Sequence, residues 1–365
     1  MPSAVRSDLT VADLGSGPCP GPVVTTLPIS YPAHWMSPVR LSSFAGTIED
    51  RTIAWMAALG LVPSPAVAEE IRAMEPRHYG GYALSLASHE YALAFCQYVT
   101  MWLRWDDEVV ENATSVSQVL PPLLALAGIE VGQAHRGDPY VRAFGYLGDE
   151  YERLGASRLW RITFADTMRD WAVQAVREEN LRRSTTGADR TVEETLALRV
   201  VTIGLLPTTM TLERAVGIEL TGSLRADPDY RALVDQASRI VCIVNDLVAV
   251  GKDLQHGQEA SNTVLCDRRN HGHGLRDAYE ALIDVHDQSI DAYDHLASRL
   301  LGRADTDFRE RLAALLAQLR YMCSGFALWH TTAARYRRYL AVEAGRAFQP
   351  SIVTTASKPD PRTAA

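Results

Sequence analysis

The chain has 365 residues and a formal net charge of −8, so we exclude general binding to nucleic acid phosphates. Its 47% hydrophobic content is enough for the buried core of one large globular domain. There is no run of eighteen apolar residues and no apolar segment near the N-terminus, so we predict neither membrane insertion nor secretion. The five cysteines are scattered without metal-ligand spacing, which is typical of reduced thiols in a cytoplasmic protein.

The two ends of the chain differ in composition from its middle. Residues 1–40 are rich in Pro, Gly, Ser and Thr, which predicts a flexible N-terminal arm, although the segment 27–35 is apolar enough to pack across the domain as a strap. Residues 346–365 predict a disordered C-terminal tail. The segment between them, 41–345, is expected to form the folded domain.

Apolar residues recur with the helical period through most of that domain. In residues 231–248 the period of 3.6 is clearest, with Leu233, Ala237, Ile240 and Val244 on one face. Proline and glycine breakers separate such stretches, and no alternating strand pattern is present. We therefore predict an all-α, single-domain helical bundle. The other predicted helical stretches are 47–60, 81–104, 137–152, 156–181, 189–218, 274–300 and 306–340.

The first acidic cluster follows an apolar and aromatic stretch, FCQYVTMWLRW (95–105). It reads DDEVVE and contains Asp106, Asp107, Glu108 and Glu111. On an α-helix Asp107 and Glu111 share one face with Asp106 at its edge, and such like charges repel unless a cation lies between them. Carboxylate oxygens suit Mg²⁺, which also bridges to phosphates. A solvated acidic helix end is the alternative for this cluster alone.

The second cluster, NDLVAVGKD, begins at Asn245 and ends at Asp253. Asn245, Ala249 and Asp253 are spaced four apart and form one stripe of a helix. An amide that continues an apolar face needs a polar partner. Lys252 is placed to meet a phosphate oxygen while Asp253 holds a metal. A capped helix end with a local Asp–Lys pair is the alternative here.

Together the two clusters resemble the aspartate-rich motif and the Asn-Ser-Glu type triad of class I terpene synthases. Arg199 lies 46 residues before Asn245, where bacterial members of that family carry a diphosphate-sensing arginine. Gly204 and Pro207 follow it and would break a helix, as the effector segment of the family does. Near the C-terminus, Trp329 and the pair Arg335–Tyr336 resemble the terminal motif. The resemblance covers roughly residues 45–340.

Three positions depart from the family pattern. The middle residue of the triad is Ala249, so one hydroxyl ligand is missing, and the last is Asp253 in place of the commoner Glu. Val110 stands where the first motif often has an acid, so Glu111 must supply the distal carboxylate. Water can complete an octahedral Mg²⁺ shell, and we expect weakened rather than abolished metal binding.

The resemblance implies a helical bundle with a central active-site cavity, in which the enzyme cyclises a prenyl diphosphate and releases diphosphate. It implies three Mg²⁺ ions acting as Lewis acids on the leaving group. Arg199, Lys252, Arg335 and Tyr336 would add donors to diphosphate oxygens. A dry wall must protect the carbocation, and aromatic faces stabilise such a charge. The candidate wall residues are Phe95, Trp102, Gly204, Phe326 and Trp329, with Asp106, Arg199, Asn245 and Asp253 as the catalytic set.

Farnesyl diphosphate is the first choice of substrate and geranylgeranyl diphosphate the second. A chain-elongating prenyl diphosphate synthase shares the fold and the Mg²⁺ chemistry, but its second motif is also aspartate-rich. A non-catalytic helical ligand-binding protein is the alternative outside enzymes. The sequence leaves open the product and whether the chain forms a homodimer.

Overall fold

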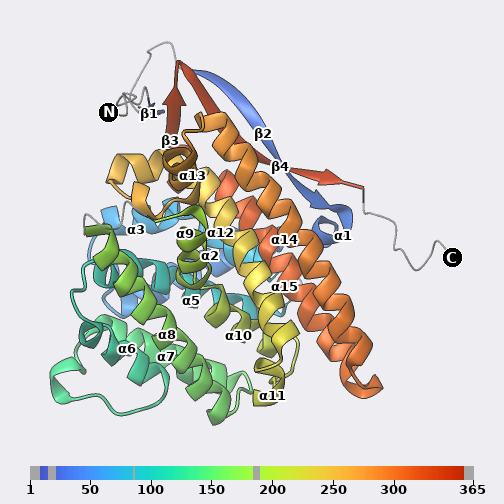
Figure 1. The fold of residues 1–365 in the computed structure, drawn as a ribbon. Coiled ribbons are helices and arrows are strands. Elements are labelled where there is room, and N and C mark those ends of the chain that lie inside the picture. Colours follow the sequence, from blue (N-terminus) through green and yellow to red (C-terminus); the bar gives the residue numbers. More distant parts are fainter. Residues whose placement is uncertain (1–8, 15–21, 85–86, 184–189, 357–365) are drawn as a thin grey trace.

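The structure is a computed structural model that describes residues 9–14, 22–84, 87–183 and 190–356. Long helices pack side by side into one bundle around a continuous apolar core, which confirms the predicted helical architecture (Figure 1). The helices are α1 (Ala33–Met36), α2 (Ala45–Ala58), α3 (Pro65–Ala73), α4 (Pro76–Ala83), α5 (His89–Trp105), α6 (Leu120–Leu126), α7 (Pro139–Arg153), α8 (Arg158–Arg183), α9 (Val192–Thr202), α10 (Leu205–Ala215), α11 (Gly222–Arg225), α12 (Pro228–His256), α13 (Thr263–His271), α14 (Leu275–Arg303), α15 (Thr306–Thr332) and α16 (Ala334–Arg337). Short turns are η1 (Asp106–Val110), η2 (Val116–Gln118), η3 (Gln133–His135) and η5 (Glu259–Ser261).

Helix α12 is the longest element that carries predicted site residues, and its ends are encoded locally. The Asp227 side chain accepts hydrogen bonds from two backbone N–H groups of the first turn, and Pro228 occupies the first helical position. Gly257 ends the helix with φ 69°, in the left-handed region that glycine adopts without strain. Because the helix is unbroken over 29 residues, Asn245 and Asp253 keep their predicted positions on one face.

The two predicted helical stretches 81–104 and 189–218 are each divided. In the first, α4 and α5 are separate helices. In the second, Gly204 separates α9 from α10 with φ 72°, as expected for a breaker at this position. The last stretch, 306–340, ends early as a helix because the chain enters a strand at Tyr339.

Both chain ends contribute to a sheet that the sequence did not predict. It has the strand order β1 (Leu9–Asp13), β3 (Tyr339–Glu343), β4 (Arg346–Thr355) and β2 (Val23–Pro32), with β2 parallel to β4. Figure 1 shows β2 and β4 running along the bundle, where β2 contacts α14 and β4 contacts α15. The expectations of a flexible arm and a disordered tail are therefore wrong for these residues, whereas the strap predicted over 27–35 does pack across the domain. The physical reason is burial: Leu27, Ile29 and Tyr31 point inward and are at most 3% exposed.

Four cysteines, Cys96, Cys242, Cys266 and Cys323, are buried and free, as predicted, and Cys19 lies outside the described residues. Two helical stretches, 192–215 and 306–332, are long and apolar enough to cross a membrane by length and composition alone. Core helices of soluble proteins pass the same test, and more than half of each apolar window is buried inside the bundle. This is weak support for a membrane span.

Candidate active site

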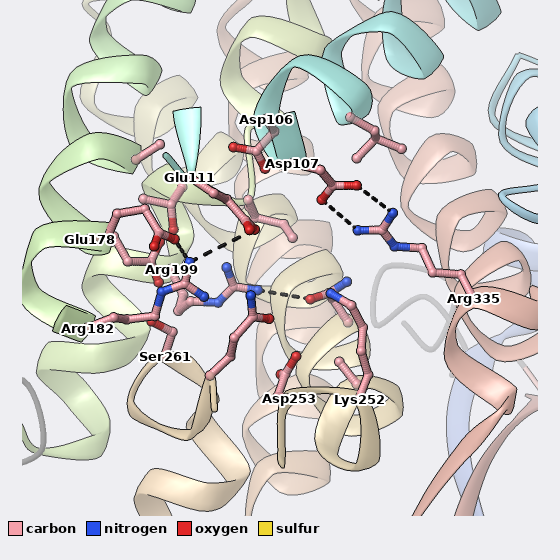
Figure 2. Close-up of a pocket in the computed structure, with 18 of the residues that line it drawn as sticks. Asp106, Asp107, Glu111, Glu178, Arg182, Arg199, Lys252, Asp253, Ser261 and Arg335 are labelled. Carbon is pink, nitrogen blue, oxygen red and sulfur yellow. Dashed lines mark hydrogen bonds and ion pairs between the residues drawn. The ribbon is translucent and has the colours of Figure 1, made fainter. Parts of the chain in front are cut away.

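A cavity of about 140 Å³ lies between the ends of α5, α8, α9, α12 and α16. Its wall combines carboxylates from η1, α8 and α12 with a lysine and arginines (Figure 2), and Asn245 adds an amide. The structure therefore brings together residues that are far apart in the sequence. The predicted site residues that line it are Trp102, Asp106, Asp107, Glu111, Arg199, Asn245, Lys252, Asp253, Arg335 and Tyr336.

The first acidic cluster continues α5 as the π-helical turn η1. The backbone N–H of Glu111 donates to the carbonyl of Asp106 over 2.9 Å, a bond that spans five residues. A π-turn holds one extra residue per turn, so Asp106 and Glu111 approach one face, and the predicted α-helical geometry is wrong in this detail. Asp106, Asp107 and Glu111 all line the cavity. Such turns are frequent at functional sites.

Asp107 forms a two-pronged ion pair with Arg335, with N–O distances of 2.9 and 3.0 Å. Burial raises the pKa of Asp107, but the Arg335 guanidinium outweighs it and lowers the pKa below its ordinary value. Glu108 points elsewhere, because Arg104 and the Tyr140 hydroxyl hold its carboxylate. Asp107 is thus paired inside the cavity, whereas Glu108 is paired outside it.

Asp106 and Glu111 are less well neutralised. Burial raises the pKa of Asp106 well above its usual value, and the neighbouring Asp107 and Glu111 charges raise it further. Burial also raises the pKa of Glu111, whose nearest cation is Arg182 with an N–O distance of 3.9 Å. Carboxylates gathered in this way gain from a bound cation.

The Asn245 amide is held at both ends. Its Oδ1 accepts from Arg199 over 2.9 Å, while its Nδ2 donates to the Tyr336 hydroxyl over 3.2 Å and lies 3.3 Å from Nε2 of His330. Burial, together with Arg199 and Arg335, lowers the pKa of His330 to about 3, so this imidazole is neutral and accepts. The amide oxygen is therefore the end directed toward Arg199.

Asp253 lies two turns further along α12 and accepts from the Asn262 side chain over 2.8 Å. Burial raises its pKa, and Lys252 partly opposes that effect. Burial and the nearby Arg335 lower the pKa of Lys252, whose side chain also lines the cavity. The site thus has acids with raised pKa values and a lysine with a lowered one, which is typical of a functional site.

The family described as "Terpene synthase family 2, C-terminal metal binding" matches residues 103–292, which include both motifs and Arg199. The match spans about half of the chain. The chain belongs to this family. It is a class I terpene synthase that uses a divalent metal and a prenyl diphosphate substrate. The alternative of a non-catalytic helical ligand-binding protein is therefore wrong.

Named relatives agree with this assignment. Pristinol synthase of Streptomyces pristinaespiralis is 25% identical over 336 residues, covering 88% of this chain and 89% of its own. A (-)-beta-caryophyllene synthase of Saccharothrix espanaensis is 26% identical over 245 residues, with coverage of 65% and 67%. The fold is shared with α-eudesmol synthase at a TM-score of 0.69, with 18% identity and coverage of 81% and 97%. Hedycaryol synthase gives 0.67 at 19% identity, with coverage of 80% and 96%.

The donor set of this terpene synthase fits hard divalent cations. Carboxylate and amide oxygens from η1 and α12 face one cavity, and two buried oxygens in its wall have no hydrogen-bond partner among the described residues. They are Oε1 of Glu178 and Oγ of Ser261. Oxygen ligands are those that Mg²⁺ prefers, and water completes its shell. Sequence reasoning missed both residues, since neither lies in a family motif.

Sequence reasoning also missed the supports of the second motif. Asp246 is 1% exposed and accepts from Arg199 at 2.8 Å and from the Thr263 hydroxyl at 2.9 Å. It therefore anchors Arg199 beside Asn245, and Asn262 orients Asp253 in the same way. Asp246 was visible next to Asn245, but nothing in the sequence indicated that Asn262 reaches back to α12.

The predicted aromatic wall divides into two groups. Trp102 lines the cavity, stacks on Tyr98 with a 5.7 Å centroid distance, and covers Gly204 so closely that an added Cβ would overlap its ring. Phe95, Phe326 and Trp329 do not line this cavity. Phe95 stacks on Phe326 at 6.3 Å, and Phe326 contacts Trp329 at 6.4 Å. Their assignment as wall residues stays a prediction.

Proposed function

We propose that this terpene synthase ionises farnesyl diphosphate with three Mg²⁺ ions and cyclises the resulting carbocation. The observation that carries the proposal is the single cavity shared by both acidic motifs, Arg199 and Arg335. Two relatives, of Saccharothrix espanaensis and Roseiflexus castenholzii, are named as cyclising (2E,6E)-farnesyl diphosphate, which favours that substrate over geranylgeranyl diphosphate.

The metal ligands in this proposal come from both sides of the cavity. Asp106, Asp107 and Glu111 would hold metal from η1, with Asn245 and Asp253 opposite them on α12. Bound Mg²⁺ supplies Lewis-acid stabilisation of the charge that develops on the departing diphosphate. The raised pKa values of Asp106 and Asp253 support this role, because a carboxyl group buried among like charges favours a neutralising partner.

Arg199, Lys252, Arg335 and Tyr336 form the diphosphate side. Guanidinium groups present planar pairs of donors that match phosphate oxygens, whereas Lys252 acts as a point charge. Burial lowers the pKa of Lys252, and repulsion from the neighbouring Arg335 lowers it further. A diphosphate anion relieves that repulsion and keeps Lys252 charged.

The hydrocarbon part of the substrate would lie against Trp102. This ring is 7% exposed, and it is held by stacking on Tyr98 and by a T-shaped contact with Trp171. An aromatic face stabilises a desolvated cation by about 2 kcal/mol or more. An apolar wall also keeps bulk water away from the cation until cyclisation is complete.

The decisive test is incubation of the purified protein with C10, C15 and C20 prenyl diphosphates in the presence of Mg²⁺, followed by gas chromatography of the extract. We expect a cyclic terpene from farnesyl diphosphate, and none when EDTA replaces Mg²⁺. A product from the C20 substrate alone would overturn the substrate assignment. Longer linear diphosphates would instead indicate chain elongation, and no product from any substrate would contradict catalysis.

A further inference from the structure

Outside the cavity, three potential metal ligands meet at the C-terminal end of α13. The carboxylate of Asp267 lies between two imidazoles, with Oδ1 2.8 Å from Nδ1 of His271 and Oδ2 2.6 Å from Nδ1 of His273. One ligand atom from each residue lies within 4.8 Å of the others. None of the three lines the active-site cavity.

The local sequence explains why these side chains meet. Asp267 and His271 are four residues apart on α13 and share a face. Gly272 then adopts φ 69°, a left-handed conformation that reverses the chain, so that His273 returns to the same carboxylate. The two imidazole rings lie 5.2 Å apart between their centroids.

The surroundings suit a cation. The Asp267 side chain is 6% exposed, whereas those of His271 and His273 are 53% and 40% exposed, so the carboxylate is fixed and an ion can enter from solvent. The adjacent Arg268 is paired with Glu343 at 2.6 Å, which draws its charge toward β3. Both imidazoles turn Nδ1 toward the same carboxylate.

We propose that Asp267, His271 and His273 bind a borderline divalent transition-metal ion of the Zn²⁺ type. Bonds of about 2.0–2.1 Å to tetrahedral Zn²⁺ separate neighbouring ligand atoms by roughly 3.3 Å, a spacing that falls within the 4.8 Å inside which the three ligand atoms lie. Imidazole nitrogen selects Zn²⁺ over Mg²⁺, which prefers oxygen ligands. The ion clamps the end of α13 to the turn before α14 and leaves a coordination position for water.

Calorimetric titration of the untagged full-length protein with ZnCl₂, in buffer with excess MgCl₂, tests this site. The variants are His271→Gln, His273→Gln and Asp267→Asn, with His295→Gln as a matched control for an exposed histidine elsewhere on the surface. We expect one Zn²⁺ per chain, with an affinity that falls at least about tenfold in each ligand variant and is unchanged in the control.

Zinc should also raise the Tm of the parent and of His295→Gln, and fail to raise the Tm of His273→Gln. Both histidines are solvent-exposed, so their replacement leaves the fold intact, and the Tm without zinc checks this. Zinc binding that persists in all three ligand variants, or that is lost only in Asp106→Asn, would assign the ion to the other cavity and overturn the proposal. An absence of zinc binding by the parent would overturn it as well.

Discussion

The two acidic motifs of the cavity are held by different kinds of partners. At η1, Asp107 is bound by both terminal nitrogens of Arg335, so a full cationic charge stabilises this side. At α12, the charge of Arg199 is directed to the buried Asp246, and Asp253 accepts an amide hydrogen bond from Asn262. In the first motif an ion pair therefore occupies a carboxylate that lines the cavity, whereas in the second the ion pair lies on Asp246 and the cavity-lining Asp253 is held by a hydrogen bond.

This difference has a consequence for substrate binding. A diphosphate competes with Asp107 for Arg335, because both are anions that fit a guanidinium fork. At α12 the competing anion is Asp246, which holds Arg199 from a buried position that does not line the cavity. We infer that diphosphate binding rearranges the η1 side more than the α12 side. Substitutions on the two sides should therefore affect the reaction rate in different ways.

The largest effect is expected for Asp106→Asn, which keeps the shape of the side chain and removes its charge. No hydrogen bond or ion pair occupies this carboxylate within the described part of the chain, so it is the acid most available to a metal. We expect the rate of cyclisation to fall at least about a hundredfold, since loss of a ligand exceeds the usual effect of losing its outer partners. Initial rates at saturating Mg²⁺ measure this.

The matched control is Glu108→Gln, two residues away. Its carboxylate is held by Arg104 and Tyr140 and lines no part of the cavity. We expect a change in rate of less than about threefold, together with a loss of stability of about 1 kcal/mol from weaker hydrogen bonds. Equal losses of rate in both variants would show that the total negative charge around η1 determines the rate, rather than metal ligation by Asp106.

Arg199→Lys tests the hydrogen-bonded side. One guanidinium reaches Asn245 and Asp246 together, and an ammonium group cannot keep that planar fork. We expect a loss of rate of roughly tenfold to a hundredfold, with Arg231→Lys, an exposed change on α12, as the control. If the Arg199→Lys variant keeps more than half of the parental rate, the arginine has a structural role only.

A feature could be predicted from the sequence where its interacting residues lie close together along the chain, and not where they lie far apart. Asn245, Ala249 and Asp253 were placed correctly because a helix fixes their spacing. The pairing of Asp107 with Arg335 spans 228 residues, and no local pattern indicates it.

The terminal sheet was missed for a similar reason. Residues 27, 29 and 31 point inward in β2, which also contains two prolines, Pro28 and Pro32. They are tolerated because β2 is an edge strand, where a missing N–H costs no ladder bond. Its partner, β4, lies more than 300 residues away.

Gly204→Ala separates a steric effect from backbone strain. An added Cβ overlaps the Trp102 ring, which stands one turn before Asp106, and φ is 72°. Gly217 has the same φ of 72° with no atom within 4 Å of an added Cβ, so Gly217→Ala carries the strain alone. We expect Gly204→Ala to be about 1–3 kcal/mol less stable than Gly217→Ala, with a roughly tenfold lower rate. Equal stabilities in urea unfolding would mean that Trp102 moves without cost.

The smallest effect is expected for Ala249→Ser, on the hydrogen-bonded side of the comparison. Ala249 lines the cavity between Asn245 and Asp253, at the position where the family pattern has a hydroxyl. A hydroxyl gained there should contribute about 1–2 kcal/mol to metal binding, so the Mg²⁺ concentration for half-maximal rate should fall several-fold to tenfold. Ala249→Cys is the control, because it adds a side chain of similar size whose soft sulfur does not suit Mg²⁺. Because α12 is already oriented by Arg199 and Asn262, we expect no change in the maximal rate. An unchanged Mg²⁺ requirement in the serine variant would show that water at this position already completes the metal shell, and that the alanine is no defect.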